Sequence, residues 1–153
     1  MQGQLVFIPV ASDELDVLVG RVPVENRRAY TVTPDLLEEL GYTADMAEDA
    51  EYAALVLASV AGLVEFGERV VVVADVDPAL VEPGEDSPNG ECLLTRCPPE
   101  SMTAWFVDAP GVDLPEVRKG ASIDEAWDMP EVQELLAEHD LLWNDVAEYR
   151  RSQ

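Results

Sequence analysis

Hydrophobic positions are densest in the segment Met46 to Phe66, where no charged residue occurs between Tyr52 and Val64. Apolar residues recur there at three- and four-residue spacing and fill most of the remaining circumference, which predicts a helix covered on more than one side. Gly67 is a C-terminal stop signal. The uncharged run of thirteen residues is shorter than the roughly twenty that span a membrane. The segment is therefore predicted to be a core helix.

The residues after this helix, Arg69 to Val76, form the strongest strand pattern in the chain. Four consecutive valines and Ala74 leave no polar position for a solvent-facing side, as expected of a central strand buried on both faces. A helix that leads into such a strand is half of a right-handed crossover if an earlier strand runs parallel to it. Leu5 to Val10 and Ala29 to Thr33 are both candidates for that earlier strand.

The remaining apolar segments are shorter and are separated by turn residues. Glu82 to Gly90, with two prolines and two glycines, is predicted to be a loop. Glu91 to Cys97 and Thr103 to Asp108 are predicted strands. Helices are predicted around Leu15–Val19, Pro34–Leu40, Glu116–Gly120, Ile123–Trp127, Glu131–Glu138 and Asp145–Arg151. The pattern assigns no state to Leu141–Trp143.

Together these segments predict one α/β domain over residues 1–153, with α+β as the alternative class. The length and the 48% hydrophobic content are sufficient for one core. We expect a mixed sheet of about five strands with helices packed on it. The helix near Met46 to Phe66 is expected on one face and the C-terminal helices on the other.

The charge of the chain restricts its partners. The formal net charge is −23, from 32 acidic and 9 basic residues. A field of this sign repels nucleic acid and anionic membranes, which are bound through clustered Lys and Arg. We therefore expect no nucleic acid and no membrane partner, and an unknown protein partner that a basic surface would suit. Solubility or salt adaptation also explains such a charge without a partner, and homo-oligomerisation is left open.

The N-terminal sequence and the cysteines indicate a cytoplasmic protein. No basic region precedes the short apolar run Leu5 to Ala11, which contains Pro9, so a signal peptide is not predicted. Cys92 and Cys97 lie five positions apart on a predicted strand and are expected on opposite faces. We interpret them as unpaired core thiols.

Three aspartates at predicted strand ends are the candidates for a metal site. Asp75 and Asp77 end the valine strand and resemble the Asp-x-Asp of the haloacid-dehalogenase-like phosphotransferases, in which the first aspartate is the nucleophile. Here the motif lies mid-chain and lacks a downstream Gly-Asp motif. Asp108 ends another predicted strand and could join them around Mg²⁺ or Ca²⁺. The alternative interpretation is that these aspartates only begin turns.

Three further residues are candidates for partner contact. His139 could act as a pH-sensitive contact, or simply end a helix where it interacts with the dipole. Trp127 lies in an acidic segment, and Trp143 follows His139 in a short apolar run. Tryptophan is common at interfaces, although core packing explains many tryptophans as well. We assign Trp105 to the core because it lies in an apolar strand.

The chain contains no nucleophile elbow, phosphate loop, dinucleotide fingerprint or zinc-protease motif. In order along the chain, Leu5–Pro9, Tyr30–Pro34, Glu51–Ala54, Arg69–Val76 and His139–Trp143 resemble a family of uncharacterised, acidic, single-domain actinobacterial proteins. That resemblance implies a cytoplasmic bacterial protein and assigns no cofactor or functional residue. The leading hypothesis is a non-enzymatic binding or regulatory module without a cofactor. The alternative is a metal-dependent, hydrolase-like enzyme that uses the three aspartates with Mg²⁺ or Ca²⁺.

Overall fold

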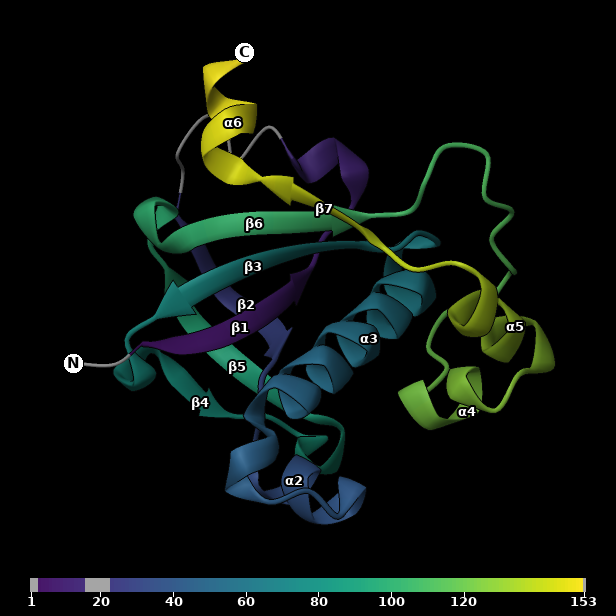
Figure 1. Cartoon of the computed structure of the whole chain (residues 1–153), viewed down its shortest axis with the longest axis horizontal. Coiled ribbons are helices and arrows are strands. Elements are labelled where there is room, and N and C mark those ends of the chain that lie inside the picture. Colours follow the sequence, from purple (N-terminus) through teal and green to yellow (C-terminus); the bar gives the residue numbers. More distant parts are fainter. Residues whose placement is uncertain (1–2, 16–22, 153) are drawn as a thin grey trace.

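The protein is an α/β structure in which helices pack on a seven-stranded sheet (Figure 1). It is represented by a computed structural model that describes residues 3–15 and 23–152. The strands are β1 (Gln4–Pro9), β2 (Val24–Tyr30), β3 (Val70–Val76), β4 (Val81–Pro83), β5 (Glu91–Cys97), β6 (Met102–Val107) and β7 (Leu142–Asp145). The α-helices are α2 (Pro34–Leu40), α3 (Ala47–Phe66), α4 (Ile123–Trp127), α5 (Pro130–Glu138) and α6 (Val146–Arg151). Short 3₁₀ turns are η1 (Ser12–Leu15), η2 (Ala44–Met46), η3 (Pro78–Leu80), η4 (Ser87–Asn89) and η5 (Pro99–Ser101).

The strand order is β4-β5-β2-β1-β3-β6-β7, and every pair of neighbours in it is antiparallel. The expected mixed pairing is therefore wrong. Because β2 and β3 both run antiparallel to β1, they are parallel to each other, with β1 between them. The chain crosses from β2 through α2 and α3 to β3. The earlier strand that runs parallel to β3 is therefore β2, which contains Ala29, and the two strands are not adjacent in the sheet.

The expected count of about five strands was too low because both edge strands are short. β4 overlaps the start of the segment predicted to be a loop, and β7 begins in the run left unassigned. Strands of three and four residues are too short to show a period of two. Glu116–Gly120, predicted to be helical, forms no helix. The prediction at Leu15–Val19 lies largely outside the described residues.

Helix α3 explains the arrangement of the other helices. Its buried residues extend around most of its circumference, from Ala50 to Leu63, and Gly67 ends it with φ 74°, as predicted. No helix in the described part of the chain is long and apolar enough to cross a membrane. One side of α3 packs on the sheet through Phe7, Val71 and Val73, while further apolar residues remain to be covered.

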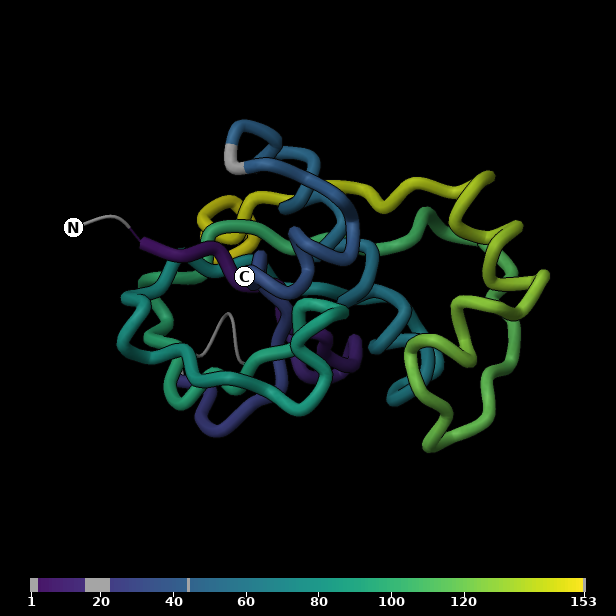
Figure 2. Tube along the Cα trace, turned by 90° about the horizontal axis from the view of Figure 1, so that it is seen from below, coloured from purple at the N-terminus to yellow at the C-terminus, as the bar shows by residue number. Residues whose placement is uncertain are grey.

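Helices α4 and α5 cover the other side of α3. Ile123 and Ala126 of α4, with Val132 and Leu135 of α5, belong to the same core cluster as α3. The prediction that the C-terminal helices cover the opposite face is thus wrong for α4 and α5, because a helix that is apolar nearly all round requires a second cover. Figure 2 shows residues 109–140 as an arm at one end of the molecule. Only α6, through Val146, contributes to the core on the opposite face.

The core cluster on the opposite face combines side chains of β2 and β5 with Val146 of α6. Cys92 and Cys97 are both buried there and unpaired, so the prediction of core thiols is confirmed. Both belong to one core cluster. Their placement on opposite faces of β5 stays a prediction, since the register with β2 runs from Cys97 to Cys92 without a shift. Burial raises the pKa of the Cys92 thiol to about 12 and also raises that of Cys97.

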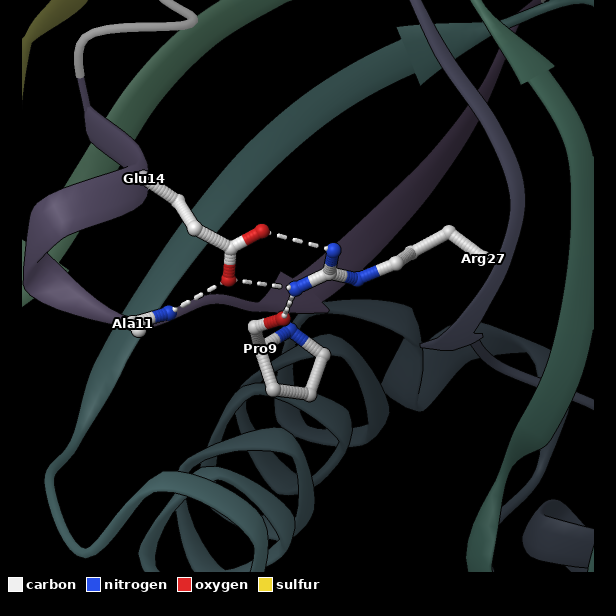
Figure 3. A network of polar contacts seen from close by, with 4 residues as sticks. All are labelled: Pro9, Ala11, Glu14 and Arg27. Carbon is white, nitrogen blue, oxygen red and sulfur yellow. Dashed lines mark hydrogen bonds and ion pairs between the residues drawn. The ribbon is translucent and has the colours of Figure 1, made fainter.

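A polar network ties η1 to β1 and β2 (Figure 3). Arg27 Nη1 and Nη2 donate to the two carboxylate oxygens of Glu14 at 2.8 and 2.9 Å, and Nη2 also donates to the Pro9 carbonyl at 2.9 Å. Glu14 accepts a further hydrogen bond from Ala11 N at 2.8 Å. The hydrogen bond and charge of Arg27 hold the pKa of Glu14 below its ordinary value, despite partial burial. The guanidinium also lies 5.6 Å from the ring centroid of Phe66, the last residue of α3.

Candidate functional site

An open apolar groove lies between α2, α3 and the α4–α5 arm and has a volume of about 580 Å³. Asp49, Tyr52, Ala53 and Val56 of α3 line it. These residues have the i, i+3, i+4, i+7 spacing of one helix face. The groove therefore runs along a face of α3 that its neighbours leave partly uncovered.

The two walls come from segments far apart in the sequence. On one side stand Leu36, Glu39 and Leu40 of α2 and the following Tyr42; on the other stand Ile123, Asp124 and Trp127 of α4 and Gln133, Leu136 and Ala137 of α5. Pro88 and Asn89 of η4 complete the lining together with Leu57. The groove is thus assembled by tertiary packing.

Capping contacts fix the α2 wall and η4. Thr33 caps α2 by accepting a hydrogen bond from Leu36 N at 2.9 Å, while its hydroxyl donates to the Ser87 carbonyl at 2.8 Å. The α2 start and η4 are therefore held together. Asn89 Nδ2 extends this connection to α4 by donating to Asp124 Oδ1 at 3.1 Å.

Local contacts within and between α4 and α5 fix the second wall of the groove. Ser122 and Glu125 form a capping box that begins α4, which satisfies two otherwise free backbone N–H groups. Pro130 occupies the first turn of α5, where its missing N–H costs no hydrogen bond. Between the two helices, Gln133 Nε2 donates to the Trp127 carbonyl at 2.6 Å. These contacts place the indole of Trp127 against the apolar cluster of α3.

The groove carries negative charge around apolar and aromatic surface. Glu39, Asp49 and Asp124 contribute carboxylates, and none of the described lining residues is Lys, Arg or His. Tyr52 is 58% exposed and Leu40 is 36% exposed. These two account for half of the large exposed hydrophobic residues in the described part of the chain, the others being Leu142 and Trp143. The arrangement can hold an apolar group while the acidic side chains attract positive charge.

The three aspartates proposed as metal ligands do not converge. Val70 at the start of β3 pairs with Val107 at the end of β6, so Asp108 lies at the opposite end of β3 from Asp75 and Asp77. Asp108 follows Val107 and so lies level with Arg69, six residues along β3 from Asp75. At the rise of a strand this separation is roughly 20 Å. The prediction of a shared site assumed that these strand ends meet at one edge, which antiparallel pairing prevents.

Each of these aspartates has another setting. Asp108 accepts hydrogen bonds from the buried Arg69, from Nε at 3.0 Å and also from Nη2. Asp77 caps η3 by accepting from Ala79 N at 2.9 Å, which is the turn role considered for it, and Asp75 is exposed. Over residues 3–15 and 23–152, no group of three or more His, Cys, Asp or Glu side chains is arranged to hold a metal ion.

The predicted partner-contact residues lie in three different places. Only Trp127 lines the groove. His139 follows the end of α5, as expected for a helix-terminal residue, with its backbone carbonyl accepting a hydrogen bond from Arg69 Nη2 at 3.0 Å. Trp143 is 61% exposed on edge strand β7. Trp105, expected in the core, is partly buried and packs edge-to-face on Tyr149 at 5.4 Å.

Sequence patterns did not indicate that several of the groove residues line a site. Tyr52, Leu40 and Leu136 are apolar residues on predicted helices, where the pattern indicates burial. Their partial exposure depends on how far α2 and α4 stand from α3, which no local pattern encodes. One sequence feature points to this helix face: the acidic Asp49 stands three residues before Tyr52, so a charged and an aromatic side chain share it.

A protein-family model described as "Family of unknown function (DUF6912)" matches residues 5–151 of the 153-residue chain. No curated protein matches the chain, and no solved structure does.

Proposed function

The chain belongs to DUF6912, a family of unknown function, and we propose that it is a non-enzymatic module that binds a basic, amphipathic helix of a partner protein in the groove between α2, α3, α4 and α5. The observation that carries the proposal is the combination of exposed apolar side chains with three carboxylates in one groove without basic residues.

The shape of the groove favours a helical partner. An amphipathic helix binds by placing apolar side chains at i, i+3, i+4 and i+7 into a groove between helices. Tyr52 and Leu40 stand half-exposed rather than buried, as suits a partner that covers them. Aromatic residues at the centre of an interface often contribute most of the binding energy, and Tyr42, Tyr52 and Trp127 are available here.

The charge favours a basic partner. Lysine and arginine on the polar face of such a helix would lie close to Glu39, Asp49 and Asp124, within a molecule of net charge −23. Complementary charge speeds association and suppresses acidic competitors. The metal-dependent alternative is not favoured, because its three aspartates lie at opposite ends of β3.

The proposal places this module in the cytoplasm of an actinobacterium, as a single domain that regulates its partner. The resemblance seen in the sequence supports that setting. Two buried, unpaired thiols also suit a reducing compartment.

The test uses a labelled synthetic helix about four turns long, with leucine at the i, i+3, i+4, i+7 positions and lysine elsewhere. A scrambled peptide of the same composition controls for simple charge attraction. We expect the amphipathic peptide to bind more tightly than the scrambled one, and both to weaken as salt screens the charges. Fluorescence anisotropy measures both affinities.

Two variants locate the binding. Tyr52→Ala is expected to weaken the affinity for the amphipathic peptide about tenfold or more and to leave the affinity for the scrambled peptide unchanged. Asp49→Asn/Asp124→Asn is expected to weaken it further than Glu82→Gln/Glu100→Gln, which removes the same charge from exposed positions outside the groove. Equal binding of the two peptides, or equal effects of the two charge variants, would refute the groove as the site.

A further inference from the structure

Strand β7 forms one edge of the sheet, and its outer side has no partner strand within the described residues. Its inner side pairs with β6 in the register Val107↔Leu142, Phe106↔Trp143, Trp105↔Asn144 and Ala104↔Asp145. An edge strand presents unpaired backbone N–H and C=O groups and can therefore template another strand. No residue of β7 lines the groove, so this edge is a separate surface.

The side chains of β7 are unusually apolar for an exposed edge. Leu142 is 48% exposed and Trp143 is 61% exposed, the largest exposed fraction among the large hydrophobic residues of the described chain. Neighbouring residues of a strand point to opposite faces, so each face of the edge carries one apolar side chain. A strand added here would cover both side chains.

The two edges of the sheet differ in protection. Proteins protect edge strands with proline, lysine, bulges or very short length. Strand β4, at the other edge, has three residues and ends in Pro83. Strand β7 contains neither proline nor lysine, and its pairing with β6 has no register shift. Strand β7 is itself short, with four residues, so the edge that carries the exposed tryptophan is the less protected of the two.

Charge decides between a second copy of the chain and a different partner. Residues 138–148 contain four acids and no lysine or arginine, and the next basic residues, Arg150 and Arg151, stand in the last turn of α6. Antiparallel pairing of two β7 strands would bring two such segments together, in molecules that each carry a net charge of −23. Like charges across an interface oppose association. A basic strand would instead gain attraction from the same four acids.

We propose that β7 binds an extended, basic segment of a partner protein by strand addition. The partner alternates arginine with aliphatic residues. Its backbone pairs with the free edge of β7. Its aliphatic side chains cover Leu142 on one face, and an arginine stacks on the indole of Trp143 on the other face as a cation–π pair.

The experiment uses a labelled peptide of alternating arginine and valine, and two controls. The first control has the same composition with arginines and valines in separate blocks. The second keeps the alternating sequence but carries N-methyl groups on the backbone amides of one edge, which removes strand-pairing donors and keeps every side chain. We expect the unmodified alternating peptide to bind most tightly in fluorescence anisotropy and to slow amide hydrogen exchange in β7.

Trp143→Ala is expected to weaken the alternating peptide about tenfold or more, and Trp143→Phe is expected to restore part of the affinity. Because Trp143 is largely exposed, both variants should keep the wild-type circular dichroism spectrum. Tyr52→Ala distinguishes the groove from the β7 edge, since it should weaken binding of the amphipathic helix and leave binding of the alternating peptide unchanged.

Three results would overturn the proposal. The first is that the alternating peptide binds no better than the block peptide. The second is that N-methylation leaves its affinity unchanged. The third is sedimentation of the free protein as a dimer that Trp143→Ala dissociates, which would assign the edge to a second copy.

Discussion

Arg69 is the one buried charged side chain in the described part of the chain, with 3% exposure. Its guanidinium bonds the Asp108 carboxylate after β6 and the His139 carbonyl after α5, so it joins the sheet to the arm that forms one groove wall. We expect Arg69→Met to lower the free energy of unfolding by about 3–5 kcal/mol, because Asp108 is left buried without its partner. Urea denaturation monitored by circular dichroism measures the loss.

The matched control is Arg118→Met, which breaks the pair with Glu125. That pair has a similar N–O distance of 2.9 Å, but its side chains are 68% and 59% exposed. Exposed pairs contribute little because solvent screens them, so the expected change stays within about 0.5 kcal/mol. Similar losses in the two variants would contradict the structural role assigned to Arg69.

Glu14 gives a prediction about pH. Its folded-state pKa is lowered from the ordinary 4.5, chiefly by the hydrogen bond from Arg27. A carboxylate with a lowered pKa stabilises the fold above its unfolded-state pKa and loses this contribution as pH falls through the folded-state value. We expect Glu14→Gln to be less stable than wild type at pH 7, and the difference to close as pH falls below 4.5. Urea unfolding across that range is the measurement, and a difference independent of pH would disprove the assignment.

Among single residues, the sequence identifies those whose contacts are with near neighbours in the chain. Gly67 ends α3 as predicted, and Thr33 and Pro130 likewise cap or begin helices, because such contacts involve only neighbouring residues. Asp108 was instead assigned to a metal site. Its partner Arg69 lies 39 residues away, and only the antiparallel register of β3 and β6 brings the two together.

Among the elements, those with a long apolar pattern were predictable. Helix α3 and strand β3 were predicted within one residue of their observed ends, because apolar residues dominate both. The short edge strands β4 and β7 were missed because their state depends on pairing with β5 and β6. The groove was also beyond prediction, since four helices from separate segments define it.

Gly90 lies where the chain segment after β2 passes close to the start of β5, next to the groove. It has φ +84°, and a Cβ placed there would lie 2.7 Å from the Thr31 carbonyl oxygen. Gly111 has a similar φ of +86° with nothing within 4 Å. We expect Gly111→Ala to cost about 1–2 kcal/mol through backbone strain alone, and Gly90→Ala to cost a further 1–3 kcal/mol or so through the steric clash. Urea denaturation compares the two variants, and equal losses would show that the close contact is absent.

For the whole molecule, the net charge of −23 predicts opposite effects of salt on folding and on binding. Self-repulsion destabilises the compact state, and the Debye length falls from about 30 Å at 0.01 M to about 8 Å at 0.15 M salt. We expect the melting temperature to rise over that range while the affinity for both basic peptides falls. Differential scanning calorimetry measures the first effect, and a flat melting temperature would show that self-repulsion contributes little.

We propose above that the groove between α2, α3, α4 and α5 binds a basic amphipathic helix. The most direct test is to follow the backbone amide resonances of the ¹⁵N-labelled protein while the leucine-lysine helix is added. We predict that the largest saturable shifts fall in α2, α3 near Tyr52, and α4 and α5, with little change in β4 and η5. Shifts spread evenly over the acidic surface, or centred away from these helices, would show that the helix does not bind in the groove.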